Sequence, residues 1–157
     1  MRVGLISDTH GLLRPEIFEV FAGVEHIIHA GDVGPAELLD ELAAIAPVTA
    51  VWGNTDGWDV RDRVPEVAEV SLGGARVVVL HGMQLGSPSP ALAVAAYPEA
   101  DLIVFGHSHR AVIKRIGRTL AVNPGSAGRP RFRDPVTAAI AQIAPDGEVT
   151  ADLIALV

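Results

Sequence analysis

Apolar runs typical of strands alternate with helical patterns along the first third of the chain. Strands are predicted over residues 2–7, 25–30 and 47–52, and helices over 15–22 and 35–46. Each helical segment opens on a proline, which is favoured at the first position of a helix. The resulting βαβαβ order predicts a parallel sheet with right-handed crossover connections.

Pairs of strand-like runs joined by tight turns follow in the remainder of the chain. They are 67–72 with 75–80 around Gly73-Gly74, 112–116 with 119–122 around Gly117-Arg118, and 136–143 with 148–156 around Pro145-Asp146-Gly147. A helix is expected over 88–97 and a strand over 101–105. Hairpins beside a βαβ half predict an α/β fold in which two sheets pack face to face with helices outside. No linker or repeat interrupts the pattern, so we expect one domain over 1–157.

Polar side chains that can bind a metal ion follow five of these strands. They are Asp8, Asp32, Asn54, His81 and His107, which come after 2–7, 25–30, 47–52, 75–80 and 101–105 in that order. Ligands of open α/β sheets bind outside the carboxyl ends of the strands, so we expect the five side chains to share one crevice. Any one of them alone is more commonly a turn former or a loop residue, and their occurrence at five strand ends is what favours a site.

Two further histidines, His10 and His109, stand two positions after Asp8 and His107. In an extended segment that offset points both side chains to the same side. Seven ligands are too many for one ion but suit two, with a carboxylate bridging ions about 3.5–4 Å apart. Nitrogen and oxygen ligands without sulfur suit Mn, Fe, Ni, Co or Zn. Glycines beside the ligands are expected to allow positive φ and close backbone approach, at Gly31, Gly53, Gly82 and Gly106.

Composition narrows this chemistry. The chain has no cysteine, which excludes disulfides and thiolate metal ligands. Its net charge of −7, from 12 basic and 19 acidic residues, argues against long nucleic acids as partners. An acidic protein that handles phosphates must supply positive charge locally, as bound metal ions can. No apolar run is long enough for a membrane span and the N-terminus lacks a signal-peptide pattern, so we expect a cytoplasmic location and no membrane partner.

Five short blocks together resemble a known family. DTH at 8–10, GD at 31–32, GN at 53–54, HG at 81–82 and GHSH at 106–109 resemble the signature blocks of the calcineurin-like metallophosphoesterase superfamily, in the same order and spacing. The short length, the GNTD form of the third block and NPGS at 123–126 are similar to the small phosphodiesterase branch of bacteria and archaea, which is YfcE-like. The resemblance implies a four-layer α/β/β/α sandwich of two mixed sheets.

An activity and a division of the ligands are also implied by the resemblance. The activity is that of a metal-dependent phosphoesterase, in the first place a phosphodiesterase, whose dinuclear centre activates water for in-line attack on phosphorus. The implied ligands of the first ion are Asp8, His10 and His109, those of the second are Asn54, His81 and His107, and the bridge is Asp32. Mn²⁺ is the first choice of metal, with Ni²⁺, Fe²⁺, Co²⁺ or Zn²⁺ as alternatives. The expected substrate is a small phosphodiester or a nucleotide-like molecule.

One position departs from the superfamily pattern. Many members carry a histidine after the GN of the third block, where it assists the leaving group or binds phosphate, and here the position is Thr55. A hydroxyl donates a hydrogen bond but cannot act as a general acid near neutral pH. We assign catalytic roles to Asp32, Asn54 and Thr55. Asp56 is interpreted as a turn-forming or capping residue, with a supporting catalytic role as the alternative.

Several other polar residues have more than one interpretation. His26 is interpreted as structural, and His29 as either structural or a support for Asp32. Three arginines alternate in the loop after NPGS, at Arg129, Arg131 and Arg133. They are either solvated, or they meet a substrate phosphate or a neighbouring subunit, so a homo-oligomer stays open.

Two alternative functions stay open as well. The first is a non-catalytic protein-binding scaffold, because a retromer subunit of the same fold serves as one, although its metal-site positions are altered. The second is a nuclease, which the acidic charge restricts to short or cyclic nucleotides. Metal content and turnover of an activated aryl phosphodiester would distinguish an enzyme from a scaffold.

Overall fold

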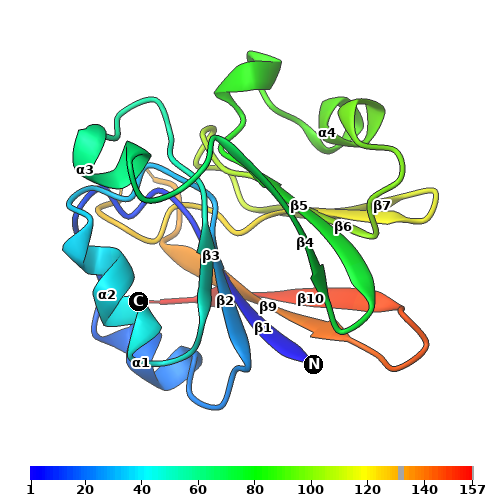
Figure 1. Cartoon of the computed structure of the whole chain (residues 1–157), viewed down its shortest axis with the longest axis horizontal. Helices are drawn as coiled ribbons and strands as arrows, with labels where there is room; N and C mark the ends of the chain where they lie inside the picture. Colours follow the sequence, from blue (N-terminus) through cyan, green and yellow to red (C-terminus); the bar gives the residue numbers. More distant parts are fainter. Residues whose placement is uncertain (131–132, 157) are drawn as a thin grey trace.

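The computed structural model describes residues 1–130 and 133–156, and the ten strands found there form two sheets of five that face each other (Figure 1). The strands of the first sheet are β1 (Arg2–Ile6), β2 (His26–His29), β3 (Val48–Ala50), β9 (Thr137–Ile143) and β10 (Val149–Ala155). Their order is β10-β9-β1-β2-β3. Strands β1, β2 and β3 are parallel, and β9 is antiparallel to β1 and β10. The predicted βαβαβ unit is therefore confirmed.

The second sheet is also mixed. Its strands are β4 (Val67–Leu72), β5 (Ala75–Leu80), β6 (Leu102–Val104), β7 (Val112–Ile116) and β8 (Thr119–Asn123). In the order β4-β5-β6-β8-β7, the three central strands are parallel and the two edge strands are antiparallel to their neighbours. The three predicted hairpins are present as β4–β5, β7–β8 and β9–β10.

Helices cover the outer faces of both sheets (Figure 1). Helices α1 (Glu16–Val20) and α2 (Glu37–Ala43) pack on the first sheet, and α4 (Pro90–Ala96) packs on the second, which confirms the four-layer sandwich. The sequence pattern does not predict α3 (Trp58–Arg61) or the 3₁₀ turn η1 (Met83–Leu85), because neither is long enough to show a helical repeat. Within residues 1–130 and 133–156, no helix combines the length and apolarity needed to cross a membrane.

Three apolar cores hold the four layers together, and alternation along each strand assigns its side chains to one core or another. In β5, Val77 and Val79 face the core between the sheets, whereas Val78 and Leu80 face the core under α4. All four side chains are buried. Burial of one such side chain stabilises by about 1.5–3 kcal/mol, so a one-residue shift of register, which would exchange the two faces, is strongly disfavoured.

The parallel strands bring the segments that follow them to one rim of the sandwich. After β1 and β2, the Asp8 N–H donates to the Gly31 carbonyl at 3.0 Å. After β5 and β6, the Gly106 N–H donates to the His81 carbonyl at 2.8 Å. The two sheets meet at this rim, because the His107 N–H donates to the Asp8 carboxylate at 3.2 Å.

Candidate metal centre

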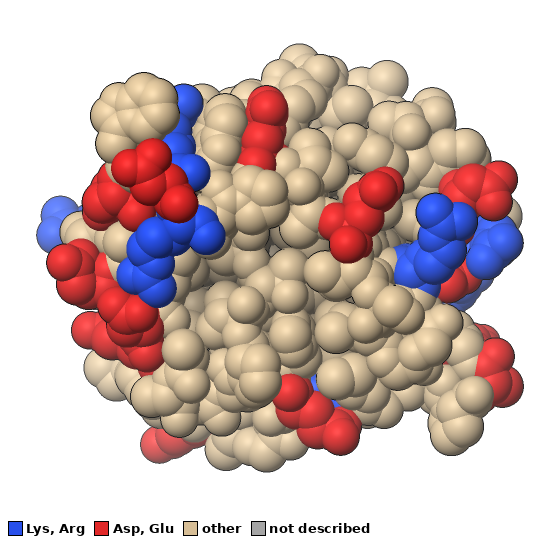
Figure 2. All heavy atoms as spheres, in the orientation of Figure 1, with Lys and Arg blue, Asp and Glu red and all other residues tan. Residues whose placement is uncertain are grey.

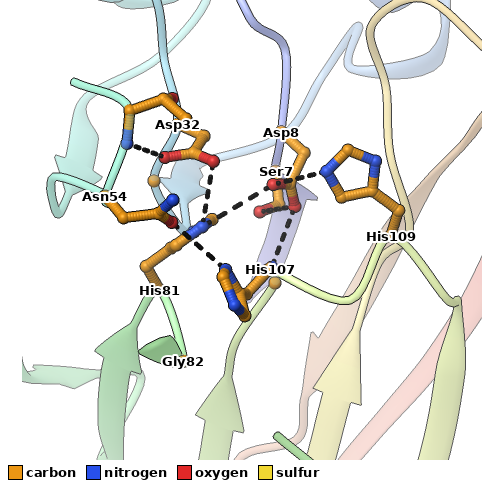
Figure 3. Close-up of polar contacts among 12 residues, drawn as sticks. Ser7, Asp8, Asp32, Asn54, His81, Gly82, His107 and His109 are labelled. Carbon is orange, nitrogen blue, oxygen red and sulfur yellow. Dashed lines mark hydrogen bonds and ion pairs between the residues drawn. The ribbon is translucent and has the colours of Figure 1, made fainter. Parts of the chain in front are cut away.

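Two buried carboxylates form the middle of the site (Figure 3). Asp8 follows β1, and its Oδ2 accepts hydrogen bonds from the Ser7 hydroxyl at 2.7 Å and the His107 N–H at 3.2 Å. Asp32 follows β2, and its Oδ1 accepts from the Thr55 N–H at 3.0 Å. Each carboxylate is thus held by the protein through one oxygen, which leaves Asp8 Oδ1 and Asp32 Oδ2 to face the crevice.

Three histidines surround these two remaining oxygens. Asp8 Oδ1 lies 3.2 Å from His109 Nε2, 3.7 Å from His10 Nε2 and 3.8 Å from His81 Nε2. Asp32 Oδ2 lies 3.1 Å from His81 Nε2 and 3.8 Å from His10 Nε2. Two groups with metal-binding geometry result, Asp8 with His10 and His109, and Asp8 with Asp32 and His81. Asp8 therefore belongs to both groups.

The unpartnered atoms of this cluster suit a cation. Within the described part of the chain, the buried Asp8 Oδ1 and His81 Nε2 have no hydrogen-bond partner. His81 Nδ1 lies 2.8 Å from the Ala30 carbonyl and donates to it, so the lone pair of a neutral His81 is on Nε2, facing the carboxylates. His10 Nε2 and His109 Nε2 are 3.4 Å apart, and two imidazole nitrogens at this distance share either a proton or a cation. Converging acceptors of this kind are stabilised by a bound metal ion.

The electrostatics of the metal-free cluster point the same way. Burial alone would lower the pKa of His81, but the nearby carboxylates of Asp32 and Asp8, 3.1 Å and 3.8 Å from its Nε2, raise it above its usual value. Burial alone would raise the pKa of Asp32, but His81 and the Thr55 N–H hold it well below its usual range. A proton on His81 would balance the two carboxylates, and a metal ion could take the place of that proton.

Asn54 and His107 lie beside this cluster and contact each other. His107 Nδ1 is 3.1 Å from Asn54 Oδ1, and the His107 ring packs edge-on against the His81 ring with centroids 5.1 Å apart. The structure therefore brings the seven predicted ligands together at one rim, with these two outside the carboxylate–histidine groups. Figure 3 labels six of them, all except His10.

Backbone strain is concentrated in the predicted ligands. Among the described residues, those with positive φ that are not glycine are Asp8 (55°), His10 (46°), Asp32 (54°), His107 (72°) and His109 (63°). This conformation costs an L-residue about 1–2 kcal/mol relative to the right-handed one. Strain of this kind persists where surrounding structure enforces it, and it clusters at functional sites.

The glycines beside the ligands act in two different ways. Positive φ, as predicted, occurs at Gly31 and Gly82. It does not occur at Gly53 and Gly106, where the prediction of positive φ is wrong. A Cβ on Gly53 would overlap the Asp32 carboxylate, and one on Gly106 would overlap the Ser7 hydroxyl and crowd the Asp8 carboxylate. The predicted close approach is to an ion, whereas the close approach in the structure is to these side chains, and it explains glycine at the two positions.

His29 supports the turn that carries Asp8 and His10. It is fully buried on β2, its Nδ1 accepts from the Gly31 N–H at 3.1 Å, and its Nε2 lies 2.9 Å from the Thr9 hydroxyl. The Thr9 hydroxyl donates to the Val33 carbonyl at 2.7 Å, so the imidazole proton is on Nε2 and points to Thr9. Burial lowers the pKa of His29 to about 4, and the ring is therefore neutral. His29 does not contact Asp32 by a hydrogen bond among the described residues, so the interpretation as a support for Asp32 holds only through the N–H of the preceding Gly31.

Asn123 is a second support, and the sequence reasoning missed it. Its side chain is fully buried at the end of β8. The amide nitrogen donates to the Gly106 carbonyl at 3.2 Å and the Ser108 hydroxyl at 3.1 Å, and the amide oxygen accepts from the Gly125 N–H at 2.9 Å. The same loop supplies Ser126, whose hydroxyl donates to the Asp8 carbonyl at 3.1 Å. The rule that polar residues at strand ends face the crevice would have found Asn123, because it ends another parallel strand.

The remaining polar residues of the prediction lie around or outside the site. Asp56 accepts the N–H of Gly53 at 2.8 Å within its own turn, as the turn-forming interpretation expects, and it also joins this turn to the loop after β2 by accepting the N–H groups of Val33 and Gly34 at 2.9 and 3.1 Å. Burial raises its pKa. His26 Nε2 lies 2.7 Å from the Thr49 hydroxyl between β2 and β3. Arg129 and Arg133 are exposed. Arg131 lies outside the described residues.

Comparison with known proteins agrees with this geometry. A family profile described as the calcineurin-like phosphoesterase superfamily domain matches residues 1–146. The chain is 36% identical over 146 residues to a probable metallophosphoesterase of Methanothermobacter thermautotrophicus, covering 86% of this chain and 82% of that protein. It is 29% identical over 161 residues to phosphodiesterase YfcE of Escherichia coli, covering 87% and 85%. Wild-type Vps29 of Entamoeba histolytica, solved in complex with zinc, has a TM-score of 0.77 at 22% identity over 100% of both chains, which shows a shared fold. The sequence blocks, the fold and the matched profile together place the chain in the calcineurin-like phosphoesterase superfamily, to which it belongs.

Proposed function

We propose that this chain is a phosphodiesterase that depends on two divalent metal ions. Its family is one of phosphoesterases. The observation that carries the metal dependence is the pair of buried, unpartnered acceptors, Asp8 Oδ1 and His81 Nε2, which face each other at 3.8 Å among three further candidate ligands. Mn²⁺ is the first metal to test, because nitrogen and oxygen ligands suit it and the similar ions Ni²⁺, Fe²⁺, Co²⁺ and Zn²⁺.

The proposed division of ligands follows the family pattern. The first ion would be held by Asp8, His10 and His109, the second by Asn54, His81 and His107, and Asp32 would bridge. The position of Asp32 supports a bridge, because its free oxygen lies near a histidine of each set, 3.8 Å from His10 Nε2 and 3.1 Å from His81 Nε2. Asp8 also approaches both sets, so it is the alternative bridge. Asn54 and His107 would have to turn from each other to become ligands.

In the proposed reaction, the ions would act on the phosphate and the protein residues would position the ligands and the leaving group. Bound ions would supply positive charge for the phosphoryl oxygens and would lower the pKa of a water for in-line attack on phosphorus. Ser7 and the Thr55 N–H fix the two carboxylates, and His29 fixes the turn between Asp8 and His10. The Thr55 hydroxyl would donate a hydrogen bond to the leaving oxygen but would not protonate it.

The surface charge favours a small substrate over a long nucleic acid. On the face drawn in Figure 2, Lys and Arg occur in small groups near the sides, next to Asp and Glu, and no continuous basic stripe crosses that face. The net charge of −7 repels a polyanion, whereas a metal centre supplies positive charge at one point. We therefore propose a small phosphodiester or nucleotide-like substrate, and keep a cytoplasmic location and a homo-oligomer as predictions.

Removal and return of metal test the proposal. Extensive chelation should abolish hydrolysis of bis(4-nitrophenyl) phosphate, and Mn²⁺ or a similar ion should restore it. Asp32→Ala should lose both ions, whereas His26→Ala, a change outside the site, should keep them. Full activity of metal-free protein would refute the metal dependence, and two tightly held ions in Asp32→Ala would refute the bridge.

A protein-binding scaffold is the second candidate. The observation that favours it is the likeness of fold to Vps29, which is stronger by TM-score than that to YfcE, 0.77 against 0.66. The seven ligand positions are all present here, which favours the enzyme. Protein that binds two ions yet hydrolyses no phosphodiester would support the scaffold.

A further inference from the structure

A pocket of about 540 Å³ adjoins the candidate metal centre at His107. One wall is the loop over residues 86–90, which leads into α4, and the other is the segment 105–112, which joins β6 to β7. His107 belongs to both places, since its ring lines the pocket and also packs against His81 of the metal centre. A phosphorus atom held at the metal centre would therefore have one of its ester groups at the mouth of this pocket.

The chemistry of the lining is that of a site for an anion on an apolar body. Phe105, Val112 and the prolines of the 86–90 loop supply apolar surface, and serines supply hydroxyls. Among the described residues that line the pocket none is acidic, in a chain with 19 acidic residues, and Arg110 is the one Lys or Arg of that set. Excluding acids in so acidic a protein makes the potential inside the pocket differ from that of the surrounding surface.

Arg110 is exposed, and its guanidinium has no protein partner among the described residues. Among residues 1–130 and 133–156, no hydrogen bond or ion pair involves that group, whereas Arg63 and Arg118 are paired with Asp40 and Asp101. The backbone of Arg110 is held, because its N–H donates to the Ser108 hydroxyl at 3.3 Å. A guanidinium presented by a held backbone can bind a carboxylate or phosphate through two parallel hydrogen bonds.

We propose that this pocket binds one ester substituent of the substrate, and that Arg110 selects a substituent that ends in a carboxylate or phosphate group. The proposal rests on the proposed phosphodiesterase function and adds a substrate class to it. The volume is within the range of about 300–1,000 Å³ that small-molecule sites occupy, enough for a ring with one anionic group. The net charge of −7 disfavours binding of an anionic substituent to the protein as a whole. A measured preference for such a substituent would therefore come from the pocket itself.

Matched substrates test the pocket. Three 4-nitrophenyl phosphodiesters are compared, in which the second ester group is 4-carboxybenzyl, 4-phosphonobenzyl or the neutral 4-carbamoylbenzyl. With Mn²⁺ present, release of 4-nitrophenolate should have a kcat/KM about 5–10-fold higher for at least one anionic ester than for the neutral one. The ratio should fall toward one in about 0.5 M salt, because Arg110 is exposed to solvent.

Variants assign the preference to Arg110. Arg110→Gln should reduce the ratio to about one and keep the metal content, and Arg110→Lys should retain part of the preference. Lys114→Gln removes an exposed cation from β7, four residues after Arg110 and outside the pocket lining, and should leave the ratio unchanged. A wild type without preference, or a preference that survives in Arg110→Gln, overturns the pocket proposal while hydrolysis of bis(4-nitrophenyl) phosphate upholds the phosphodiesterase. Failure to hydrolyse bis(4-nitrophenyl) phosphate with metal bound overturns both.

Discussion

The buried, neutral His29 should make the metal-free protein less stable in mild acid. The ring is fully buried and burial lowers its pKa to about 4. In the unfolded chain the same imidazole titrates near pH 6.5. Below pH 6.5 the unfolded state therefore binds a proton that the folded state does not. The free energy of unfolding should fall as the pH falls from about 6.5 to about 4, and this contribution is constant below that.

The size of the effect follows from the two pKa values. Between pH 7.5 and pH 5, a shift from 6.5 to about 4 removes about 2 kcal/mol from the free energy of unfolding. His81 acts in the opposite direction, because its raised pKa gives a contribution that is present below 6.5 and is lost as the pH rises through the folded value. The lowered pKa of Asp32 gives stability that is lost only in stronger acid. The pH dependence of wild-type stability contains all three contributions. The contribution of His29 is therefore measured as a difference between the wild type and a variant.

Urea unfolding of His29→Gln in chelator, at pH 7.5 and pH 5, isolates the contribution of His29. Glutamine does not titrate and offers one acceptor and one donor to Gly31 and Thr9. We expect the variant to lose about 2 kcal/mol less than wild type between the two pH values. His26→Gln is the control on the same strand, because His26 is only partly buried and should change the pH dependence much less. Equal pH dependence of wild type and His29→Gln would show that His29 is not held neutral by burial.

Three further predictions address the strain, the supports and the leaving group. In urea unfolding without metal, His109→Gly should be more stable than His109→Ala by about 1 kcal/mol, because φ at position 109 is 63° and glycine adopts positive φ without strain. Equal stability of the two variants would show that the turn is unstrained. Asn123→Ala should lower the free energy of unfolding by about 1–3 kcal/mol and weaken metal binding, since it leaves the buried Gly125 N–H unpaired and removes one of the two hydrogen bonds to the Gly106 carbonyl, and an unchanged metal affinity would contradict its role as a support. Rates for aryl phosphodiesters should fall steeply as leaving-group pKa rises, and Thr55→His should recover part of the about 10²–10⁴-fold contribution of a general acid for poor leaving groups. A flat dependence in the wild type, with chemistry limiting, would mean that another residue donates the proton.

The fold and the clustering of the candidate ligands could be predicted because both depend on patterns that are local in sequence. Alternation within each strand assigns its two faces, and parallel strands must end at a common rim. That logic brought Asp8 and His81 together although 73 positions, from 8 to 81, separate them. It did not reveal α3 and η1, whose lengths are below one clear helical repeat, and the two short elements contribute few apolar contacts.

Two supports of the site, Thr9 and Asn123, escaped prediction because their partners are set by tertiary contacts. The hydroxyl of Thr9 meets His29 across two strands, and the amide of Asn123 meets a loop that follows a different strand. Neither residue has a spacing that distinguishes it from an ordinary polar residue. The rule that polar residues follow strand ends could have identified Asn123. It could not have identified Thr9, because the role of Thr9 depends on its contact with His29, and the sequence does not show which of the two histidines in β2 is buried.

The strained turns explain why supports and ligands form one unit. The sequence led to the expectation that glycines would carry the positive φ, yet in the structure Asp8, His10 and His109 carry it themselves. Each must reverse the chain at a strand end and also present a side chain to the crevice, and glycine could do only the first. The buried hydrogen bonds of Thr9 and Asn123 hold the adjacent backbone. They can therefore stabilise the positive φ of the predicted ligands, which would relax without this support. It follows that loss of a support should weaken metal binding without removing any ligand atom, which is the behaviour that separates a preorganised site from a loose cluster of acids and imidazoles.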